Sequence, residues 1–503
     1  MAAKNENYRR SVSVTRAVSV YPKILHPQSK ILSLSNLDRQ CPTLMYMVLF
    51  YSPPCDANYA GHRSVCSVFD SLRCGLEEAL AIWYPAAGRL SLSPSDGKLN
   101  LWCNNKGAIL AEATTETRIS ELGDLTQYND FFERLVFKPD FGGNFSEMPL
   151  VVAQVTKFGC GGYSIGIGTS HSLFDGPAAY NFLSAWAFSS AMMKAQKKHN
   201  NSLEMFKPVH ERATLLMLGS SSTTSTNSQA PKGIDHKLAS KLISNYNYHP
   251  KTGAAAIDHL LQLIMQATAD DQRNFQKIGT STSTAAGSSN DIRKGFVFKT
   301  FHLSGNFVES LTRKVLEEGG TGGFSCSSFE VVATLLWKAR TKAMGLRKEK
   351  MACLQFAVDT RNKLVPPLPN GFSGNAYVLA SVALSAGEVE KLGFKAIIEK
   401  IRVAKDSVNN DYVKAYMEGL LGPQASLPPL KELTLVSDWT RMPFHKLGFF
   451  NAGSAFVSPL VPPIPQVAYF IQNPDDNLAV DVRIGLPPQI LNVFSSYFFA
   501  GSQ

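Results

Sequence analysis

Alternating and periodic hydrophobic positions predict a mixed α/β chain. Short β-type runs cover residues 45–51, 98–103, 148–158 and 162–170, and amphipathic helix patterns cover 71–84 and 177–198. Strands interleaved with helices in this way indicate sheets that carry helices on their faces. Residues 12–22 alternate at strand period, so we expect a first strand there. The basic, acid-poor start of the chain also fits a transit peptide, but the strand is the favoured interpretation.

The second half of the chain has the same style of pattern. Strand patterns cover 295–304 and 351–360, helix patterns cover 327–344 and 394–409, and residues 466–486 are typical of a hairpin. Residues 219–233 and 279–291 are rich in Ser, Thr and Gly without apolar period, which predicts mobile linkers around a helix pattern at 254–275. We therefore expect one domain at 1–206, a crossover at 207–293 and a second domain at 294–503.

Size and composition agree with two globular cores. The chain has 503 residues, 44% of them hydrophobic, and single cores stop growing near ~250–300 residues. Its formal charge is 50 − 40 = +10, but the Lys and Arg residues are scattered, which favours anionic small molecules over nucleic acid as partners. The chain shows no apolar core of a secretory signal and no stretch of eighteen uninterrupted apolar residues, so we expect a cytoplasmic protein without a membrane span.

The eight cysteines form no C-x-x-C pair and no Cys/His knuckle. This pattern predicts reduced thiols and no structural zinc.

One stretch, GIGTSHSLFDGPAAY at 166–180, carries candidate chemistry. His171 and Asp175 lie four residues apart between a strand pattern and a helix that begins at Gly176-Pro177. A strand-to-helix junction can present His171 to a cleft as a catalytic base. A structural histidine beside an aspartate that caps the helix is the competing interpretation. The spacing alone leaves both open.

Two other kinds of chemistry fit this region less well. Residues 162–166 match G-x-S-x-G, which would make Ser164 the nucleophile of a serine hydrolase, but a nucleophile elbow needs a helix directly after the serine. The residues after Ser164 are typical of a strand. A metal shared by His171 and Asp175 lacks further ligands at a fixed spacing, so we expect no metal.

Landmarks elsewhere in the chain bear on this choice. They are LSNLD (34–38), YPAAGRL (84–90), SSFEVVATLLWKARTKA (327–343), VDTRNKLVPPLPNGFSGNA (358–376) and SDWTRMPF (437–444). Together with HSLFDG, they resemble in order and spacing the plant BAHD acyltransferases, which transfer acyl groups from coenzyme A thioesters to alcohols or amines. The resemblance extends from end to end of the chain.

The resemblance implies a fold and a set of roles. The fold would be two α/β domains resembling chloramphenicol acetyltransferase, with mixed sheets and a channel between them. His171 matches the family's catalytic histidine, Asp175 its scaffold aspartate and Arg361 the arginine that pairs with this aspartate. Acyl-CoA would be a co-substrate, with no permanently bound cofactor, and the protein would be a monomer.

The chemistry fits such a site. A thiol leaves readily, since its pKa is near ~8.5, so His171 would need only to take the proton of the acceptor O–H or N–H. Trp439 matches a family tryptophan whose indole N–H can bind the oxyanion, with Ser437 as a second donor. A buried aromatic between strands is the alternative for Trp439.

The chain departs from the family at its second signature. Where the family has D-F-G-W-G, this sequence has Gly448-Phe449-Phe450-Asn451-Ala452. Some relatives with a degenerate second motif are accessory proteins, for example in very-long-chain lipid elongation, so a non-catalytic accessory role is the alternative to acyl transfer. The long Ser/Thr-rich crossover is a second departure.

Overall fold

The computed structural model of the chain describes residues 11–26, 29–52, 67–142, 144, 146–194, 207–220, 253–277, 295–318, 324–420, 430–450, 456–460 and 465–500. The chain forms two compact units. Unit 1 comprises Met1–Leu216, Leu368–Ala376 and Met442–Pro462, and unit 2 comprises Met217–Pro367, Tyr377–Arg441 and Pro463–Gln503. These units differ from the contiguous division at 206 and 294, because two segments of the second half pack with the first.

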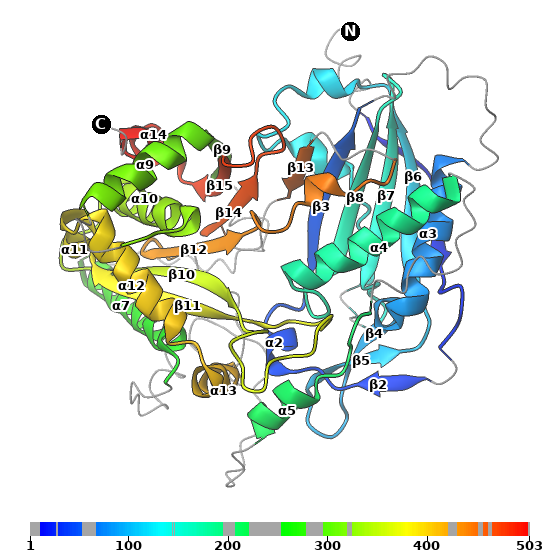
Figure 1. Cartoon of the computed structure of the whole chain (residues 1–503), viewed down its shortest axis with the longest axis horizontal. Coiled ribbons are helices and arrows are strands. Elements are labelled where there is room, and N and C mark those ends of the chain that lie inside the picture. The colour runs from blue at the N-terminus through cyan, green and yellow to red at the C-terminus, as the bar shows by residue number, and fades with distance from the viewer. Residues whose placement is uncertain are drawn as a thin grey trace. The chain divides into compact units, whose positions relative to one another are not determined.

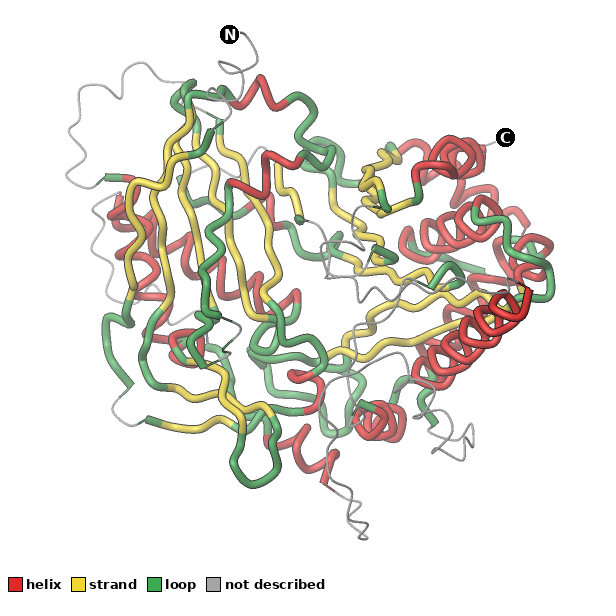
Figure 2. Tube along the Cα trace, turned by 180° about the vertical axis from the view of Figure 1, so that it is seen from behind, coloured by secondary structure: helices red, strands yellow, loops and turns green. Residues whose placement is uncertain are grey.

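Unit 1 contains a six-stranded mixed sheet in the order β1-β6-β7-β8-β3-β13. Its strands are β1 (Ser13–Val20), β6 (Ala108–Thr115), β7 (Val151–Phe158), β8 (Tyr163–Ser170), β3 (Leu44–Tyr51) and β13 (Phe456–Pro459). The β6–β7 pair is parallel and the other pairs are antiparallel. The long strands run side by side (Figure 2). The first strand predicted from the alternation at 12–22 is confirmed as β1.

A smaller sheet and several helices complete unit 1. The sheet has the order β2-β5-β4, with β2 (Lys30–Leu32), β5 (Leu99–Cys103) and β4 (Arg89–Leu92). The helices are α2 (Asn36–Arg39), α3 (Val68–Ile82), α4 (Gly176–Lys194) and the 3-10 turns at Tyr84–Ala87, Ile119–Leu122, Asp130–Arg134 and Phe444–Lys446. Helix α5 (Ala213–Ser220) spans the junction of the two units.

Helices α3 and α4 lie side by side against one face of the large sheet (Figure 1). The indole of Trp186 on α4 is fully buried and donates to the Leu72 carbonyl of α3 at 2.8 Å. A Cβ atom at Gly75 of α3 would collide with Ser190 of α4, so the glycine allows the close approach. The predicted helices at 71–84 and 177–198 are thus confirmed over the described residues.

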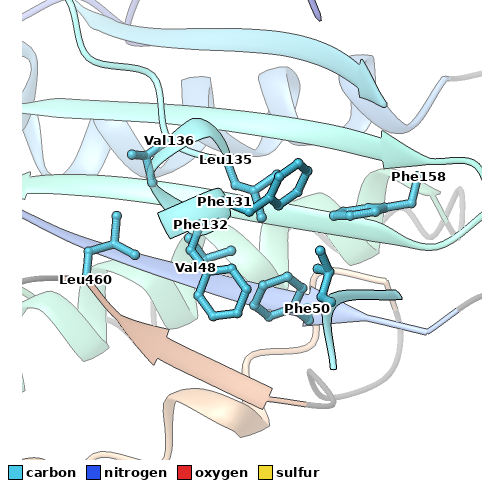
Figure 3. Packing of buried hydrophobic residues seen from close by; sticks show 9 residues of the cluster. Val48, Phe50, Phe131, Phe132, Leu135, Val136, Phe158 and Leu460 are labelled. Carbon is cyan, nitrogen blue, oxygen red and sulfur yellow. The ribbon is translucent and has the colours of Figure 1, made fainter. Parts of the chain in front are cut away.

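An aliphatic and aromatic cluster holds the returning chain against β3 (Figure 3). Its buried members are Val48, Phe50, Leu122, Phe131, Phe132, Leu135, Val136, Phe158 and Leu460. Leu460 comes from the second half of the sequence and packs with residues of the first half. Burial of apolar surface of this kind contributes about 25 cal/mol per Å².

The segment that replaces the family's second signature also belongs to unit 1. Phe449 is 2% exposed, and its ring meets the Trp186 ring edge-on at 4.9 Å. Phe450 meets Tyr51 edge-on at 4.6 Å, and the Tyr51 hydroxyl donates to the Leu447 carbonyl at 2.9 Å. The altered motif is therefore packed into the unit, although Asn451 and Ala452 lie outside the described residues.

Unit 2 contains a second six-stranded mixed sheet, in the order β11-β10-β12-β14-β15-β9. Its strands are β9 (Val297–Leu303), β10 (Met351–Asp359), β11 (Tyr377–Ser385), β12 (Leu433–Asp438), β14 (Val467–Gln472) and β15 (Val480–Leu486). Strand β12 runs parallel to both β10 and β14, and the other pairs are antiparallel. The hairpin predicted at 466–486 is confirmed as β14–β15.

The helices of unit 2 are α7 (Ala255–Lys277), α9 (Gly305–Glu318), α10 (Ser328–Ala343), α11 (Ala386–Lys391), α12 (Phe394–Asp406), α13 (Asn410–Gly419), α14 (Leu491–Ala500) and a 3-10 turn at Pro488–Ile490. The predicted cap of α10 is confirmed, since Ser327 accepts from the Glu330 N–H and Glu330 accepts from the Ser327 N–H. The Ser/Thr-rich stretches at 221–233 and 279–291 lie outside the described residues. In the part of the chain that is described, no helix is long and apolar enough to cross a membrane.

We predict that Phe449→Ala lowers the free energy of unfolding by about 3–5 kcal/mol, because it leaves a cavity beside Trp186. Denaturant unfolding measures the change. Leu92→Ala is the control, since Leu92 is 65% exposed and its truncation removes little packing. Equal, small effects of both substitutions would contradict the role of Phe449 in the core.

Candidate active site

His171 lies directly after β8 and before α4, at the junction that the sequence predicts. The backbone N–H of His171 donates to the Thr43 carbonyl at 2.9 Å, which ties the junction to the residue before β3. The side chain is partly exposed, whereas Ser172, Leu173 and Phe174 beside it are buried. The imidazole is therefore presented outward from a well-packed turn.

Asn375 fixes the imidazole of His171. Its Oδ1 lies 3.1 Å from His171 Nδ1, and its Nδ2 donates to the His171 carbonyl at 2.7 Å and to Asp38 Oδ1 at 3.1 Å. Both partners of Nδ2 accept hydrogen bonds, so the amide nitrogen must face them and Oδ1 must face the imidazole. Because Oδ1 can only accept, Nδ1 of His171 carries the proton of this bond, and Nε2 is the ring nitrogen that remains for proton transfer.

Asp38 anchors Asn375 from behind. The carboxylate is fully buried and accepts from the Asn375 N–H at 2.9 Å, the Ser35 N–H at 3.0 Å and the Ser35 hydroxyl at 2.7 Å. Arg212 Nε lies 3.4 Å from the other side of the same carboxylate, Oδ2. These donors satisfy the hydrogen-bonding capacity of the buried carboxylate. His171, Asn375, Asp38 and Arg212 thus form one network within unit 1.

The loop that carries Asn375 fits closely against residues 207–212. The Val209 N–H donates to the Gly371 carbonyl at 2.9 Å, and the Ser373 N–H donates to the Val209 carbonyl at 2.8 Å. Gly371 has φ +81° and leaves no room for a Cβ beside the Lys207 carbonyl. A Cβ at Gly374 would lie 2.6 Å from Arg212 Nη2. Both glycines of the NGFSGN stretch are therefore required by its packing.

Asp175 is held by backbone donors. The side chain is 4% exposed, and its two oxygens accept from the Ala178 N–H at 3.1 Å and the Ala376 N–H at 3.0 Å. The first bond caps α4 at its N-terminus, which agrees with the capping interpretation of this residue. The second ties α4 to the loop of Asn375, so Asp175 supports the geometry around His171.

Gly176 lies against Met442, because a Cβ at position 176 would meet the sulfur of that side chain. Met442 begins the returning segment of unit 1, and Phe444 within it packs edge-on against Tyr180 of α4. The start of α4 is thus held by a segment from the second half of the chain.

The remaining predicted site residues belong to unit 2. Trp439 follows β12, and its indole N–H donates to the Ser437 hydroxyl at 3.1 Å, so these two candidate donors lie together. The indole ring packs against Tyr469 at 5.2 Å. Arg361 follows β10 and bonds to Asp359 through its guanidinium at 3.3 Å and its N–H at 2.8 Å.

Ser164 is not a nucleophile. It lies in the middle of β8, between Phe50 of β3 and Thr156 of β7, and is fully buried. A strand continues after it for six more residues, to Ser170, where an elbow would require a helix. The serine-hydrolase hypothesis is therefore wrong.

Among the described residues, no group of three or more His, Cys, Asp or Glu side chains could hold a metal ion. The described cysteines are free thiols, namely Cys41, Cys74, Cys103, Cys160, Cys326 and Cys353. Cys55 and Cys66 lie outside the described residues.

The sequence pattern does not identify Asn375, Asp38 or Arg212 as site residues. Asp38 and Asn375 lie within two of the landmarks, LSNLD and the stretch that ends in SGNA, but Arg212 lies in none of them. The sequence offered one indication of Asp38 and Asn375: both lie within landmarks that flank HSLFDG along the chain. Their contacts span more than 160 positions of the chain, and no local pattern reports such contacts.

The described residues form two six-stranded mixed sheets, with the partly exposed His171 at a strand–helix junction. The family model described as the transferase family matches residues 10–247 and 250–500. The chain belongs to this family, the plant BAHD acyltransferases, as its landmarks predict, and it is an acyl-CoA-dependent acyltransferase.

Named relatives and a solved structure agree. The chain is 49% identical to Brassinosteroid-related acyltransferase 1 of Arabidopsis thaliana, over 97% of this chain and 98% of that protein. It is 26% identical to Omega-hydroxypalmitate O-feruloyl transferase of Arabidopsis thaliana, over 95% of this chain and 91% of that protein. The fold is similar to that of vinorine synthase, with a TM-score of 0.65 at 17% identity over 98% and 100% of the two chains.

Burial lowers the pKa of His210, in the 207–212 segment, to about 4. The unfolded chain binds this proton below about pH 6.5 and the folded chain does not, so the free energy of unfolding falls as the pH drops from 6.5 towards 4. We expect a loss of about 1.4 kcal/mol per pH unit from this group.

The variant His210→Gln keeps a donor for the Ile82 carbonyl, which His210 Nε2 meets at 3.1 Å, but does not titrate. Denaturant unfolding at pH 7, 6 and 5 should show a shallower pH dependence in the variant. Equal slopes in the variant and the wild type would contradict the assignment.

Proposed function

We propose that this protein transfers an acyl group from an acyl-CoA thioester to a hydroxyl or amine of a plant metabolite, with His171 as general base. The observation that carries this role is the bond between His171 Nδ1 and Asn375 Oδ1, which assigns a proton to Nδ1 and makes Nε2 the nitrogen that can act as the base. A base must have a free lone pair at the atom that takes the proton. Nε2 of the partly exposed imidazole is the nitrogen that we propose takes the proton.

In the proposed reaction, Nε2 of His171 takes the proton of the acceptor O–H as that oxygen attacks the thioester carbonyl. The tetrahedral intermediate then collapses, the C–S bond breaks and the proton passes from the imidazolium to the thiolate. The products are an ester and free coenzyme A. General base catalysis of this kind contributes about 10²–10⁴ in rate. The imidazolium that forms keeps its Nδ1–H on Asn375, so the ring need not turn during the reaction.

Trp439 and Ser437 are the proposed donors to the oxyanion. Their side chains already bond to each other, so the indole N–H and the serine hydroxyl can be aimed at one oxygen. Loss of one such donor commonly costs about 10²–10³ in rate. The indole N–H would exchange its bond to Ser437 for a bond to the oxyanion.

For the acceptor, we propose a steroid alcohol as the first class to test. The support is the 49% identity to a relative named as brassinosteroid-related over nearly all of both chains. The acyl group is open, so acetyl, benzoyl, hydroxycinnamoyl and fatty acyl-CoA belong in the same screen. We further propose that the protein acts as a cytoplasmic monomer without a permanently bound cofactor.

We predict that the purified protein releases free thiol from an acyl-CoA in the presence of its acceptor, and that His171→Ala lowers this rate by about 10²–10⁴. Thiol titration and mass spectrometry of the product measure both effects. Ser164→Ala is the matched control and should keep the wild-type rate.

A thiol-release rate that is unchanged in His171→Ala would contradict the role of His171 as general base. A wild-type protein that is silent on a broad panel, with a His171→Ala variant that still complements a loss-of-function plant, would favour the accessory role instead.

Asp175→Asn should lower the melting temperature and the thiol-release rate together. The amide cannot accept from both the Ala178 and Ala376 N–H groups, and an unsatisfied buried group costs about 1–3 kcal/mol. If Asp175 also pairs with Arg361, as we propose, the cost rises to about 3–5 kcal/mol. Differential scanning calorimetry and the thiol assay test this. Lost activity at an unchanged melting temperature would show that Asp175 acts in the chemistry itself.

A further inference from the structure

Arg212 is a buried cation that the reaction does not use. Its side chain and that of Asp38 are both fully buried, and Arg212 Nε lies 3.4 Å from Asp38 Oδ2. Arg212 Nη1 donates to the His210 carbonyl, and the guanidinium lies 5.6 Å from the centre of the Phe372 ring. A buried charge is costly unless it is paired, so this arginine is held in place by Asp38.

The Arg212 side chain also packs against the loop that carries Asn375. A Cβ at Gly374 would lie 2.8 Å from Arg212 Cζ and 3.0 Å from the Phe372 ring. Arg212 therefore touches the loop one residue before Asn375 and, at the same time, the carboxylate that Asn375 bonds to. Neither contact reaches His171 directly, so any effect on the imidazole must pass through Asn375.

Arg212 matters because the Asn375 amide can turn over when its hydrogen-bond acceptors change. An ionised Asp38 can only accept, so Asn375 must turn its Nδ2 towards it. Without Arg212, the Asp38 carboxylate could move away from Asn375, and Nδ2 would keep only the His171 carbonyl as an acceptor. An amide held by one acceptor could turn over more easily and present Nδ2 to the imidazole. Nδ1 of His171 would then have to accept a hydrogen bond from Nδ2 of Asn375. The ring proton would move to Nε2, and Nε2 could no longer take the proton of the acceptor substrate.

We propose that Arg212 is a positioning residue, which holds the Asp38 carboxylate in place and thereby the Asn375 amide in the orientation that keeps the proton of His171 on Nδ1. The proposal rests on the proposed role of His171 as base. Two acceptors hold the Asn375 nitrogen, Asp38 and the His171 carbonyl, and Arg212 controls the first of them. The beginning of the crossover, at residues 207–212, is thereby part of the catalytic architecture.

Four variants of the full-length protein test this. Arg212→Met removes the charge at similar length, and Arg212→Lys keeps it. The double variant Asp38→Leu/Arg212→Met removes both charges, so it restores the charge balance but leaves no acceptor at position 38 for Asn375 Nδ2. Arg340→Met is the control for the loss of any buried arginine, since Arg340 is 4% exposed and donates to the Lys431 carbonyl at 2.9 Å.

Three readouts are taken on each variant. Nitrogen-15 NMR of histidine-labelled protein, with the His171 signal identified from its absence in His171→Gln, gives the tautomer. Steady-state thiol release gives kcat and KM, and thermal unfolding gives the melting temperature. The NMR readout needs no substrate, so it decides the proposal even if the wild type shows no transferase activity.

We expect Arg212→Met to shift the His171 signal towards the Nε2–H tautomer and to lower kcat about tenfold at similar KM, the size expected for one lost hydrogen bond. Arg212→Lys should keep the Nδ1–H tautomer. The double variant should regain melting temperature but neither the tautomer nor kcat. Arg340→Met should lose stability with an unchanged tautomer.

A further cycle tests whether Arg212 acts through Asn375. In the Asn375→Ala background, Arg212→Met should cause no additional loss of kcat. A folded Arg212→Met variant with the wild-type tautomer and kcat would overturn the proposal. So would recovery of the tautomer and kcat in the double variant, because Arg212 would then matter only for folding.

Discussion

The carboxylate of Asp38 is the point on which the site depends. It is fully buried and accepts from Ser35, Asn375 and Arg212, which lie far apart in the sequence. An isolated buried carboxylate would be strongly unfavourable, so these donors must all be in place when unit 1 folds. The orientation of Asn375, and through it the tautomer of His171, follows from this one charged group.

Unit 1 is complete only when residues from both halves of the chain are in place. The bonds from Asp38 to Asn375 span 337 positions, and β13 pairs with β3 across the length of the chain. The first half supplies five strands of the large sheet, and the second half supplies the sixth strand and the loop that fixes the base. The proposed base, which lies directly after a strand of the first half, is thus oriented by residues of the second half.

Periodicity predicted the elements of both units, because alternation and helical spacing are local properties of burial. The junction at His171 and the cap of α10 are local in the same sense. Asn375 and Arg212 could not be found this way, since their roles depend on contacts that no window of sequence contains. The altered second motif shows the same limit of local patterns. In the sequence, the stretch with Phe449 and Phe450 is only a departure from the family's signature, but both rings pack against aromatic residues of unit 1.

The central claim is that His171 carries its proton on Nδ1, facing Asn375. Neutron diffraction from crystals of the deuterium-exchanged wild-type protein would locate that hydrogen directly, together with the two on Asn375 Nδ2. We expect density for deuterium on His171 Nδ1 towards Asn375 Oδ1, on Nδ2 towards Asp38, and none on Nε2. Deuterium on Nε2 with a bare Nδ1, or an Asn375 amide turned the other way, would contradict the account.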